Sequence, residues 1–196
     1  MTLSPEDIRS QLQESCRVKQ SFSDDLVARI AQFAEKCVSA LRQGRKIVFF
    51  GNGGSAADAL HLAAELVVRL RADRPGLPAL ALTTNPAVLT AASNDFGFEH
   101  VFARQIESLV AAGDILVALS TSGTSPNVVR GVAAGRDRGA FMVALTGETG
   151  GALADKVDLL INVPSRDSQR IQEAHITIGH IVCDAVEKAF LPAPRG

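Results

Sequence analysis

Five short apolar runs constrain the fold of this chain more than any other feature of its sequence. They lie between residues 46 and 163 and read KIVFF, ALAL, ILVALS, FMVALT and DLLINV. Each run is continuously apolar rather than alternating, which is typical of strands that are covered on both faces. Because helical patterns lie between them, the sequence predicts an α/β fold in which a parallel sheet is layered between helices and ligands bind beyond the carboxyl ends of the strands.

Three long helices are expected outside this alternating core. The segment from Ser4 to Asp7 combines an N-cap, a proline and two acids, which is typical of a helix start. A second start at Ser23 leads into apolar residues at helical spacing that end at Gly44. The segment from Asp167 to Phe190 is interpreted as one closing helix with a broad apolar face. No linker or repeat divides the chain, so residues 1–196 are expected to form one domain.

The charge balance and the cysteines limit the function classes. Lys and Arg number 20 against 21 Asp and Glu, for a net charge of -1, which gives no basic surplus for nucleic acid or an anionic membrane. No apolar run approaches the ~18 to 20 residues that cross a bilayer. Cys16, Cys37 and Cys183 lack CxxC spacing and are interpreted as core thiols of a cytoplasmic protein. Any anionic ligand must therefore be held by local groups.

A glycine-rich turn, GNGGSA at residues 51–56, directly follows the first apolar run. Its glycines permit positive φ and close backbone approach, and the helix behind it offers free N–H groups to an anion. A dinucleotide site would need an acid at the end of the second strand, where the chain has Thr83, Thr84 and Asn85. No Gly-Lys-Ser/Thr follows, so the turn is not a nucleoside-triphosphate loop. A turn that serves only strand-to-helix geometry is the alternative.

A second loop, STSGTSP from Ser120 to Pro126, follows the third apolar run. Ser125 is placed as the N-cap of the next helix, with Pro126 as its first residue. The other hydroxyl side chains form a dense set of neutral donors at a helix N-terminus, which favours a phosphate. A solvated serine-rich turn is the alternative.

A third loop, SNDFGF at residues 93–98, carries Asn94 and Asp95. Taken alone, these residues indicate a turn before the next helix. Near the other two loops they could bind sugar hydroxyls.

The helix behind the glycine turn carries His61 and Glu65 on one face, because they are four residues apart. A buried carboxylate needs a partner, and the closing helix offers Gln172 and His180, eight residues apart. That separation is ~12 Å of helix, so a metal site built from these four residues is compatible with the spacing but not implied by it. His175 is expected to point elsewhere.

The combined motifs resemble a known family. GNGGSAADALHLAAEL, RPGLPALAL, NDFGFEHVFARQ, STSGTSPNVV, ALTGETGGAL and RIQEAHITIGH are similar to the phosphoheptose isomerases of the sugar-isomerase (SIS) fold. The resemblance implies a single SIS domain with a five-stranded, doubly wound, flavodoxin-like sheet. It also implies a cytoplasmic homotetramer with N-terminal helices, about residues 4–43, in the interface. Such an enzyme binds zinc and converts sedoheptulose 7-phosphate to D-glycero-D-manno-heptose 7-phosphate, the first step toward ADP-heptose.

The resemblance also implies roles for individual residues. The substrate and its phosphate would be held by Asn52, Gly53, Gly54, Ser55, Ser120, Thr121, Ser122 and Ser125. Asn94 and Asp95 would bind the sugar, and Glu65 and Gln172 would also contact the substrate. Glu65 and His180 would carry out the proton transfer, and the zinc ligands would be His61, Glu65, Gln172 and His180. Gln169 departs from the pattern, because better-known members have an acid there.

Two other function classes share these loops. Related SIS proteins act as non-catalytic adaptors that bind the replication initiator DnaA, and an adaptor has no need of an acid and a base such as Glu65 and His180. A sugar-phosphate sensor would carry a DNA-binding module, for which no segment is left. The sequence therefore favours the isomerase.

Overall fold

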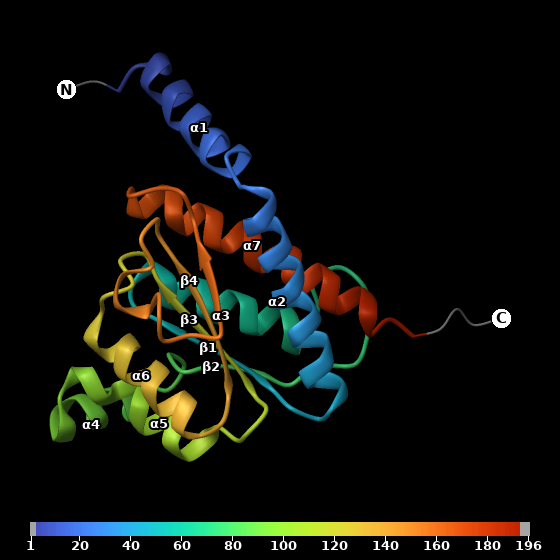
Figure 1. Cartoon of the computed structure of the whole chain (residues 1–196), viewed down its shortest axis with the longest axis vertical. Helices are drawn as coiled ribbons and strands as arrows, with labels where there is room; N and C mark the ends of the chain where they lie inside the picture. The colour runs from blue at the N-terminus through green and yellow to red at the C-terminus, as the bar shows by residue number, and fades with distance from the viewer. Residues whose placement is uncertain (1–2, 193–196) are drawn as a thin grey trace.

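A parallel five-stranded sheet lies at the centre of the computed structural model, which describes residues 3–192 (Figure 1). Its strands are β1 (Ile47–Gly51), β2 (Ala79–Ala81), β3 (Ile115–Ser120), β4 (Phe141–Thr146) and β5 (Leu159–Asn162). They lie in the order β2-β1-β3-β4-β5. This order is flavodoxin-like, with the switch point between β1 and β3. The predicted sheet is confirmed.

Helices cover both faces of the sheet and make it the middle of three layers (Figure 1). One face packs against α2 (Asp24–Arg42), α3 (Gly54–Val67) and α7 (Ser168–Ala189). The other face packs against α4 (Pro86–Phe96), α5 (Val101–Leu109) and α6 (Pro126–Asp137), and two short 3₁₀ turns, η1 (Phe98–His100) and η2 (Gly151–Leu153), complete the order.

Each strand contributes to both cores, because successive side chains point to opposite faces. In β1, Ile47 and Phe49 enter the core under α2, α3 and α7, whereas Val48 and Phe50 enter the core under α4, α5 and α6. All of β1 is buried. This double burial is the physical reason why the strand sequences are continuously apolar, and it confirms the expected three-layer sandwich.

The N-terminal helix α1 (Pro5–Gln20) extends away from the sheet (Figure 1). A capping box between Ser4 and Asp7 starts it, as predicted, but Val18 is its one buried residue. Cys16, expected to be a core thiol, is exposed on this helix, because the described part of α1 buries only Val18. Cys37 and Cys183 are buried as expected.

The other predicted helix boundaries are confirmed within one or two residues. Ser23 caps α2 by accepting a hydrogen bond from the N–H of Leu26, and Gly44 follows the helix with a φ of 72°. Asp167 caps α7. Residues 1–2 and 193–196 of the proposed domain lie outside the described part of the chain, so its full extent stays a prediction. Within residues 3–192, no helix combines the length and apolar character that a membrane span requires.

Candidate active site

The glycine turn, the serine-rich loop and the closing helix meet around one small cavity. It lies at the carboxyl ends of β1 and β3, where ligands of doubly wound sheets usually bind. Its volume is ≈ 90 Å³, and it is lined by Asn52, Ser55, Leu119, Ser120, Thr121, Ser122, Ser125 and Gln172. Seven of these eight residues offer polar side chains and none is charged. The structure thus brings together segments that lie more than a hundred residues apart.

Two helices begin at this cavity without a side-chain cap. The N-cap of α3 is Gly53, with a φ of 55°, and the N-cap of α6 is Ser125. Neither makes a side-chain capping hydrogen bond. Ser125 is the N-cap residue of α6 and Pro126 the first helical residue, as predicted, but the Ser125 hydroxyl makes no capping bond and the residue lines the cavity. The positive ends of both helix dipoles favour an anion here, and α3 adds its first-turn N–H groups. In α6, Pro126 has no N–H and the Val128 N–H is bonded to Asn127 Oδ1 and to the carbonyl oxygen of Ser125.

The loops around the cavity are braced by contacts that the sequence analysis did not predict. Asn52 and the buried Asn127 exchange two amide hydrogen bonds, each of 2.8 Å, which join the glycine turn to α6. Gly123 has a φ of 66°, and a Cβ there would lie 2.1 Å from the carbonyl oxygen of Gly150. Only glycine fits this backbone contact, so the TGETGG stretch acts as a support for the serine-rich loop.

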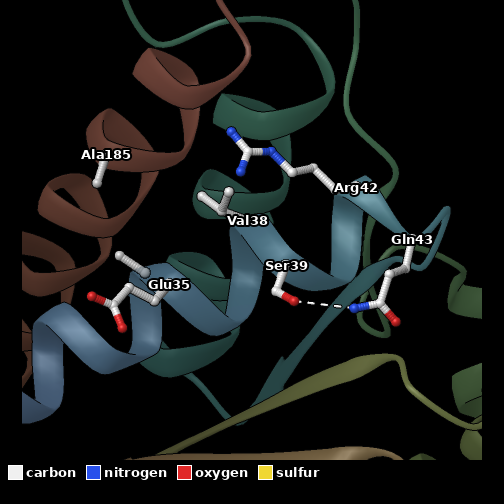
Figure 2. A pocket seen from close by; sticks show the side chains of 7 residues that line it. Glu35, Val38, Ser39, Arg42, Gln43 and Ala185 are labelled. Atoms are coloured by element: carbon white, nitrogen blue, oxygen red, sulfur yellow. Dashed lines mark hydrogen bonds between the residues drawn. The ribbon is translucent and has the colours of Figure 1, made fainter.

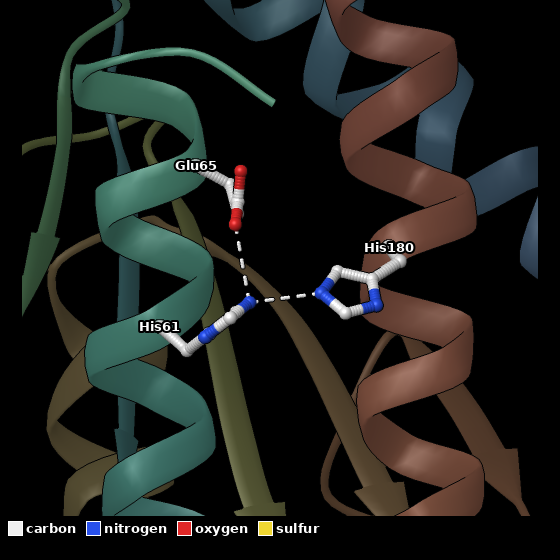
Figure 3. Close-up of side chains that lie close together, drawn as sticks. All are labelled: His61, Glu65 and His180. Carbon is white, nitrogen blue, oxygen red and sulfur yellow. Dashed lines mark hydrogen bonds and ion pairs between the residues drawn. The ribbon is translucent and has the colours of Figure 1, made fainter. Parts of the chain in front are cut away.

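A cluster of two imidazoles and a carboxylate lies farther along α3 (Figure 3). His61 Nε2 lies 2.9 Å from His180 Nε2 of α7 and 3.1 Å from Glu65 Oε1. The three ligand atoms lie within 4.8 Å of one another. The predicted partnership between α3 and the closing helix is thus present for these three residues.

The cluster has the donor set and size of a metal site. A tetrahedral zinc ion with bonds of 2.0–2.2 Å has ligand atoms about 3.4 Å apart. The contacts of His61 are a few tenths of an ångström shorter than that, so small side-chain movements would open the space. A single N–H on His61 Nε2 could only be shared between His180 and Glu65, whereas a cation would be bound by a lone pair from each of the three ligand atoms. These residues therefore fit a zinc ion.

Gln172 lies at the other end of the site. A Cβ on Gly54 would lie 2.6 Å from Gln172 Nε2, so the amide packs directly on the glycine turn. It also lines the cavity. Gln172 thus lines the cavity together with Asn52 and the serine-rich loop.

A groove with a larger volume lies elsewhere, over α2 and α7 (Figure 2). Its volume is ≈ 510 Å³, and its lining comes from α2 and from Ala185 of α7. Gln43 donates a 3.1 Å hydrogen bond to Ser39 inside it. None of the candidate site residues lines this groove, so its size alone does not make it the site of chemistry.

Comparisons with known proteins agree with this arrangement. The SIS domain family model matches residues 12–147. A phosphoheptose isomerase of Geobacter metallireducens is 54% identical over 94% of this chain and 98% of its own. Solved structures of phosphoheptose isomerases from Neisseria gonorrhoeae and Francisella tularensis are 43% and 37% identical, with TM-scores of 0.87 and 0.91. The Neisseria gonorrhoeae match spans 93% of this chain and 98% of the solved chain. The Francisella tularensis match spans 95% of this chain and 100% of the solved chain.

The chain belongs to the phosphoheptose isomerase family of SIS-domain proteins. The expectation of an isomerase is confirmed, and the matches give no support to a DnaA adaptor.

The two remaining predicted sugar contacts, Asn94 and Asp95, do not line the cavity. Asn94 and Asp95 occupy the last turn of α4, where Asn94 donates a 2.8 Å hydrogen bond to Asp95. Both are exposed, and neither lines the cavity. The expected turn before the next helix is therefore wrong, because α4 continues to Phe96 and ends at Gly97, which has a φ of 88°.

Two polar features of this family member were not predicted from the sequence: the half-buried Asp58 and the buried pair of Arg74 and Glu187. Asp58 lies three residues before His61 on α3, and burial raises the pKa of its carboxyl to about 6 against the opposing effect of His61. The i,i+3 spacing of Asp58 and His61 could have indicated from the sequence that the two side chains are neighbours on α3. Arg74 and Glu187 form a buried ion pair at the C-terminal end of α3. The sequence feature that could have indicated this pair is Arg74, a charged residue directly before the turn-forming Pro75 and Gly76.

His175 plays a structural part, as its predicted orientation implied. It is fully buried, and its Nε2 lies 3.1 Å from the carbonyl oxygen of Thr146. Burial lowers the pKa of its imidazole to about 4. The neutral ring therefore belongs to the core under α7, away from His61 and His180.

Proposed function

We propose that this member of the phosphoheptose isomerase family isomerises sedoheptulose 7-phosphate to D-glycero-D-manno-heptose 7-phosphate. One observation carries the proposal: α3 begins at a cavity suited to a phosphate and, further along, carries an acid and an imidazole facing the imidazole of α7. The names of the relatives support the same substrate class. The reaction is the first step toward ADP-heptose.

The phosphate is held by neutral groups. Hydroxyls from Ser55, Ser120 and Ser125 face the cavity together with the amides of Asn52 and Gln172. Two uncapped helix N-termini add backbone N–H groups and favourable dipoles. Charge-assisted hydrogen bonds from such donors hold a dianion without Lys or Arg.

The reacting carbons lie farther along α3. His61 is six residues after Ser55, about 9 Å of helix rise, and Glu65 is ten residues after it, about 15 Å. Side chains on a helix lean toward its N-terminus, so the Glu65 carboxylate reaches back toward the cavity. A short sugar chain anchored by its phosphate spans this separation.

The chemistry moves one proton between C1 and C2. The Glu65 carboxylate removes a proton from C1 of the ketose and returns it to C2 of the enediol. His180 transfers the accompanying proton between the two oxygens, as an imidazole can near neutral pH. Bonds and charges balance, because each proton that leaves one atom is returned to its neighbour.

A zinc ion is part of the proposal. His61, Glu65 and His180 would hold it, and Gln172 as a fourth ligand stays a prediction. When bound, zinc polarises a carbonyl and stabilises negative charge on its oxygen. A carboxylate bound to zinc is a weaker base, so Glu65 serves one role at a time. The homotetramer and the cytoplasmic location belong to the same proposal.

A matched pair of variants tests the two ends of the site. Glu65→Gln keeps the size of the side chain but removes the base, so kcat should fall by at least ~10² to 10⁴ while sugar-phosphate binding is retained. Ser125→Ala removes one hydrogen bond to a charged group, worth ~1.5 to 3 kcal/mol, so binding should weaken by roughly 10- to 150-fold. Aldose formation from sedoheptulose 7-phosphate and calorimetric binding give the two readouts.

Because the Ser125 hydroxyl makes no capping bond, its loss should leave the unfolding temperature nearly unchanged. Isomerase activity of Glu65→Gln close to that of the unmodified protein would refute the assignment of the base. Unchanged binding by Ser125→Ala would refute the assignment of the phosphate cavity.

A further inference from the structure

We infer that the buried Arg74–Glu187 pair is a positioning device that fixes α3 against α7 and thereby sets the geometry of Glu65, His61 and His180. This inference rests on the proposed function of those three residues. Neither Arg74 nor Glu187 lines the cavity, and Arg74 contacts the cluster only through the backbone carbonyl of Glu65, so the pair acts through the helices that carry the cluster.

Arg74 closes the C-terminal end of α3. Its Nη2 donates a 2.8 Å hydrogen bond to the carbonyl oxygen of Glu65, and its Nη1 donates a 2.8 Å bond to that of Leu66. The last carbonyls of a helix have no partner within the helix and form the negative end of its dipole. A guanidinium satisfies two of them at once because its donors form a fixed fork. The backbone of Glu65 itself is thus held by Arg74.

Glu187 ties the same region to α7. Its Oε2 accepts a 2.9 Å hydrogen bond from the N–H of Leu70, and its Oε1 accepts 2.9 Å bonds from the N–H groups of Arg71 and Ala72. Its Oε2 also lies 3.4 Å from Arg74 Nε. One carboxylate therefore anchors the chain segment that leaves α3.

The pair is aligned with the cluster on both helices. Glu187 follows His180 by seven residues, two helical turns, so both side chains lie on the same side of α7. On α3, Arg74 holds the carbonyl of Glu65, one turn beyond His61. Metal ligands must stay within about 0.2 Å of their proper distances, so a small slide of α7 along α3 would disrupt the cluster.

The energetics favour a role in geometry over one in stability. The side chains of Arg74 and Glu187 are 0% and 4% exposed. Removing two charges from water costs several kcal/mol per ion, and well-packed apolar residues often replace buried pairs without loss of stability. What apolar residues cannot replace is the set of directed hydrogen bonds to Glu65, Leu66 and the segment after α3.

The test compares Arg74→Lys with a matched control. Lysine keeps the charge but has one nitrogen, which cannot span both carbonyls. We expect kcat for sedoheptulose 7-phosphate and zinc affinity each to fall by about 10- to 100-fold, as for the outer partners of metal ligands. KM should change little, because the cavity lies at the other end of α3. Zinc affinity is measured on metal-stripped protein by competition with a chelating dye. Glu187→Gln should show the same pattern.

The control is Lys46→Gln, which breaks a different ion pair that is only partly buried. Lys46 Nζ lies 2.6 Å from Asp114 Oδ2 at the amino ends of β1 and β3, opposite the cavity. This variant should lower the unfolding temperature and leave kcat and zinc affinity unchanged. Near-normal kcat and zinc affinity in both Arg74→Lys and Glu187→Gln would overturn the inference. If the unmodified protein does not act on the sugar phosphate, the proposed function fails, while a loss of zinc affinity in the variants still supports the positioning role.

Discussion

At the scale of single residues, His175 makes the stability of the protein depend on pH. Its folded pKa is about 4, below the ordinary value of 6.5, because it is buried. Between pH 6.5 and 4 the unfolded chain therefore binds a proton that the folded chain does not. Folding stability falls as pH decreases through this window, by about 3 kcal/mol in all.

The measurement is the free energy of unfolding in urea at pH 7 and pH 4.5, at one protein concentration. His175→Gln keeps a donor for the carbonyl of Thr146 but does not titrate, so most of this pH-dependent loss should disappear. An equal loss in both proteins would mean that other groups control the acid response.

Local spacing predicted part of the site, and tertiary contacts decided the rest. The i,i+4 spacing placed His61 and Glu65 on one face because it depends on α3 alone. The approach of His180 depends on how α7 crosses α3, which no local pattern contains. Helix-start preferences predicted Ser125 as the N-cap residue of α6, but they could not show that its hydroxyl makes no capping bond.

At the scale of elements, the crossing of α3 and α7 depends on Gly179. A Cβ at this position would lie 2.4 Å from Cδ2 of Leu62, which is buried between His61 and Glu65 on α3. Gly179→Ala gains ~1 kcal/mol of helix propensity but pushes the helices apart. We expect stability close to that of the unmodified protein, together with a clear loss of kcat and zinc affinity.

A glycine on the opposite face provides the control. A Cβ on Gly135 of α6 would lie 2.6 Å from Met142 Sδ, compared with 2.4 Å for the closest contact at Gly179. Gly135→Ala should change the unfolding temperature and leave kcat unaffected. Equal losses of kcat in both variants would argue against a specific role for the α3–α7 crossing.

The elements themselves were largely predictable. Continuous apolar runs identified all five strands because burial on both faces removes the polar alternation. The sequence misjudged the segment around Asn94, where turn-forming residues lie within α4. Tertiary packing overrides such preferences, and the turn comes only at Gly97.

At the scale of the whole molecule, exposed apolar side chains predict assembly. Most of the apolar face of α2 is buried against the sheet and α7, although Val27 of this helix is 54% exposed. On α1, however, Ile8 and Leu12 are 48% and 63% exposed, and near the cluster Val68 and Ile181 are 66% and 52% exposed. A homotetramer would cover such surfaces.

Light scattering should therefore give four times the chain mass of 20.6 kDa. Leu12→Glu places a charge in the exposed apolar stripe of α1 and should shift the protein toward smaller species. Gln13→Glu adds the same charge at the neighbouring exposed position and should shift it less. A mass of 20.6 kDa for the unmodified protein would contradict the prediction.

The placement of the phosphate cavity and the acid–imidazole cluster on a single helix has a consequence for how substrate preference can evolve. A helix is stiff, so the distance between the phosphate cavity and the reacting groups is fixed. Sugars are therefore selected by the length of their carbon chain as well as by their hydroxyl groups. Changes in the loops can alter how tightly the phosphate is gripped without changing that length. A preference for a shorter or longer carbon chain would instead require the reacting groups to move by a whole turn along α3, so we expect substitutions in the loops to leave the preferred chain length unchanged.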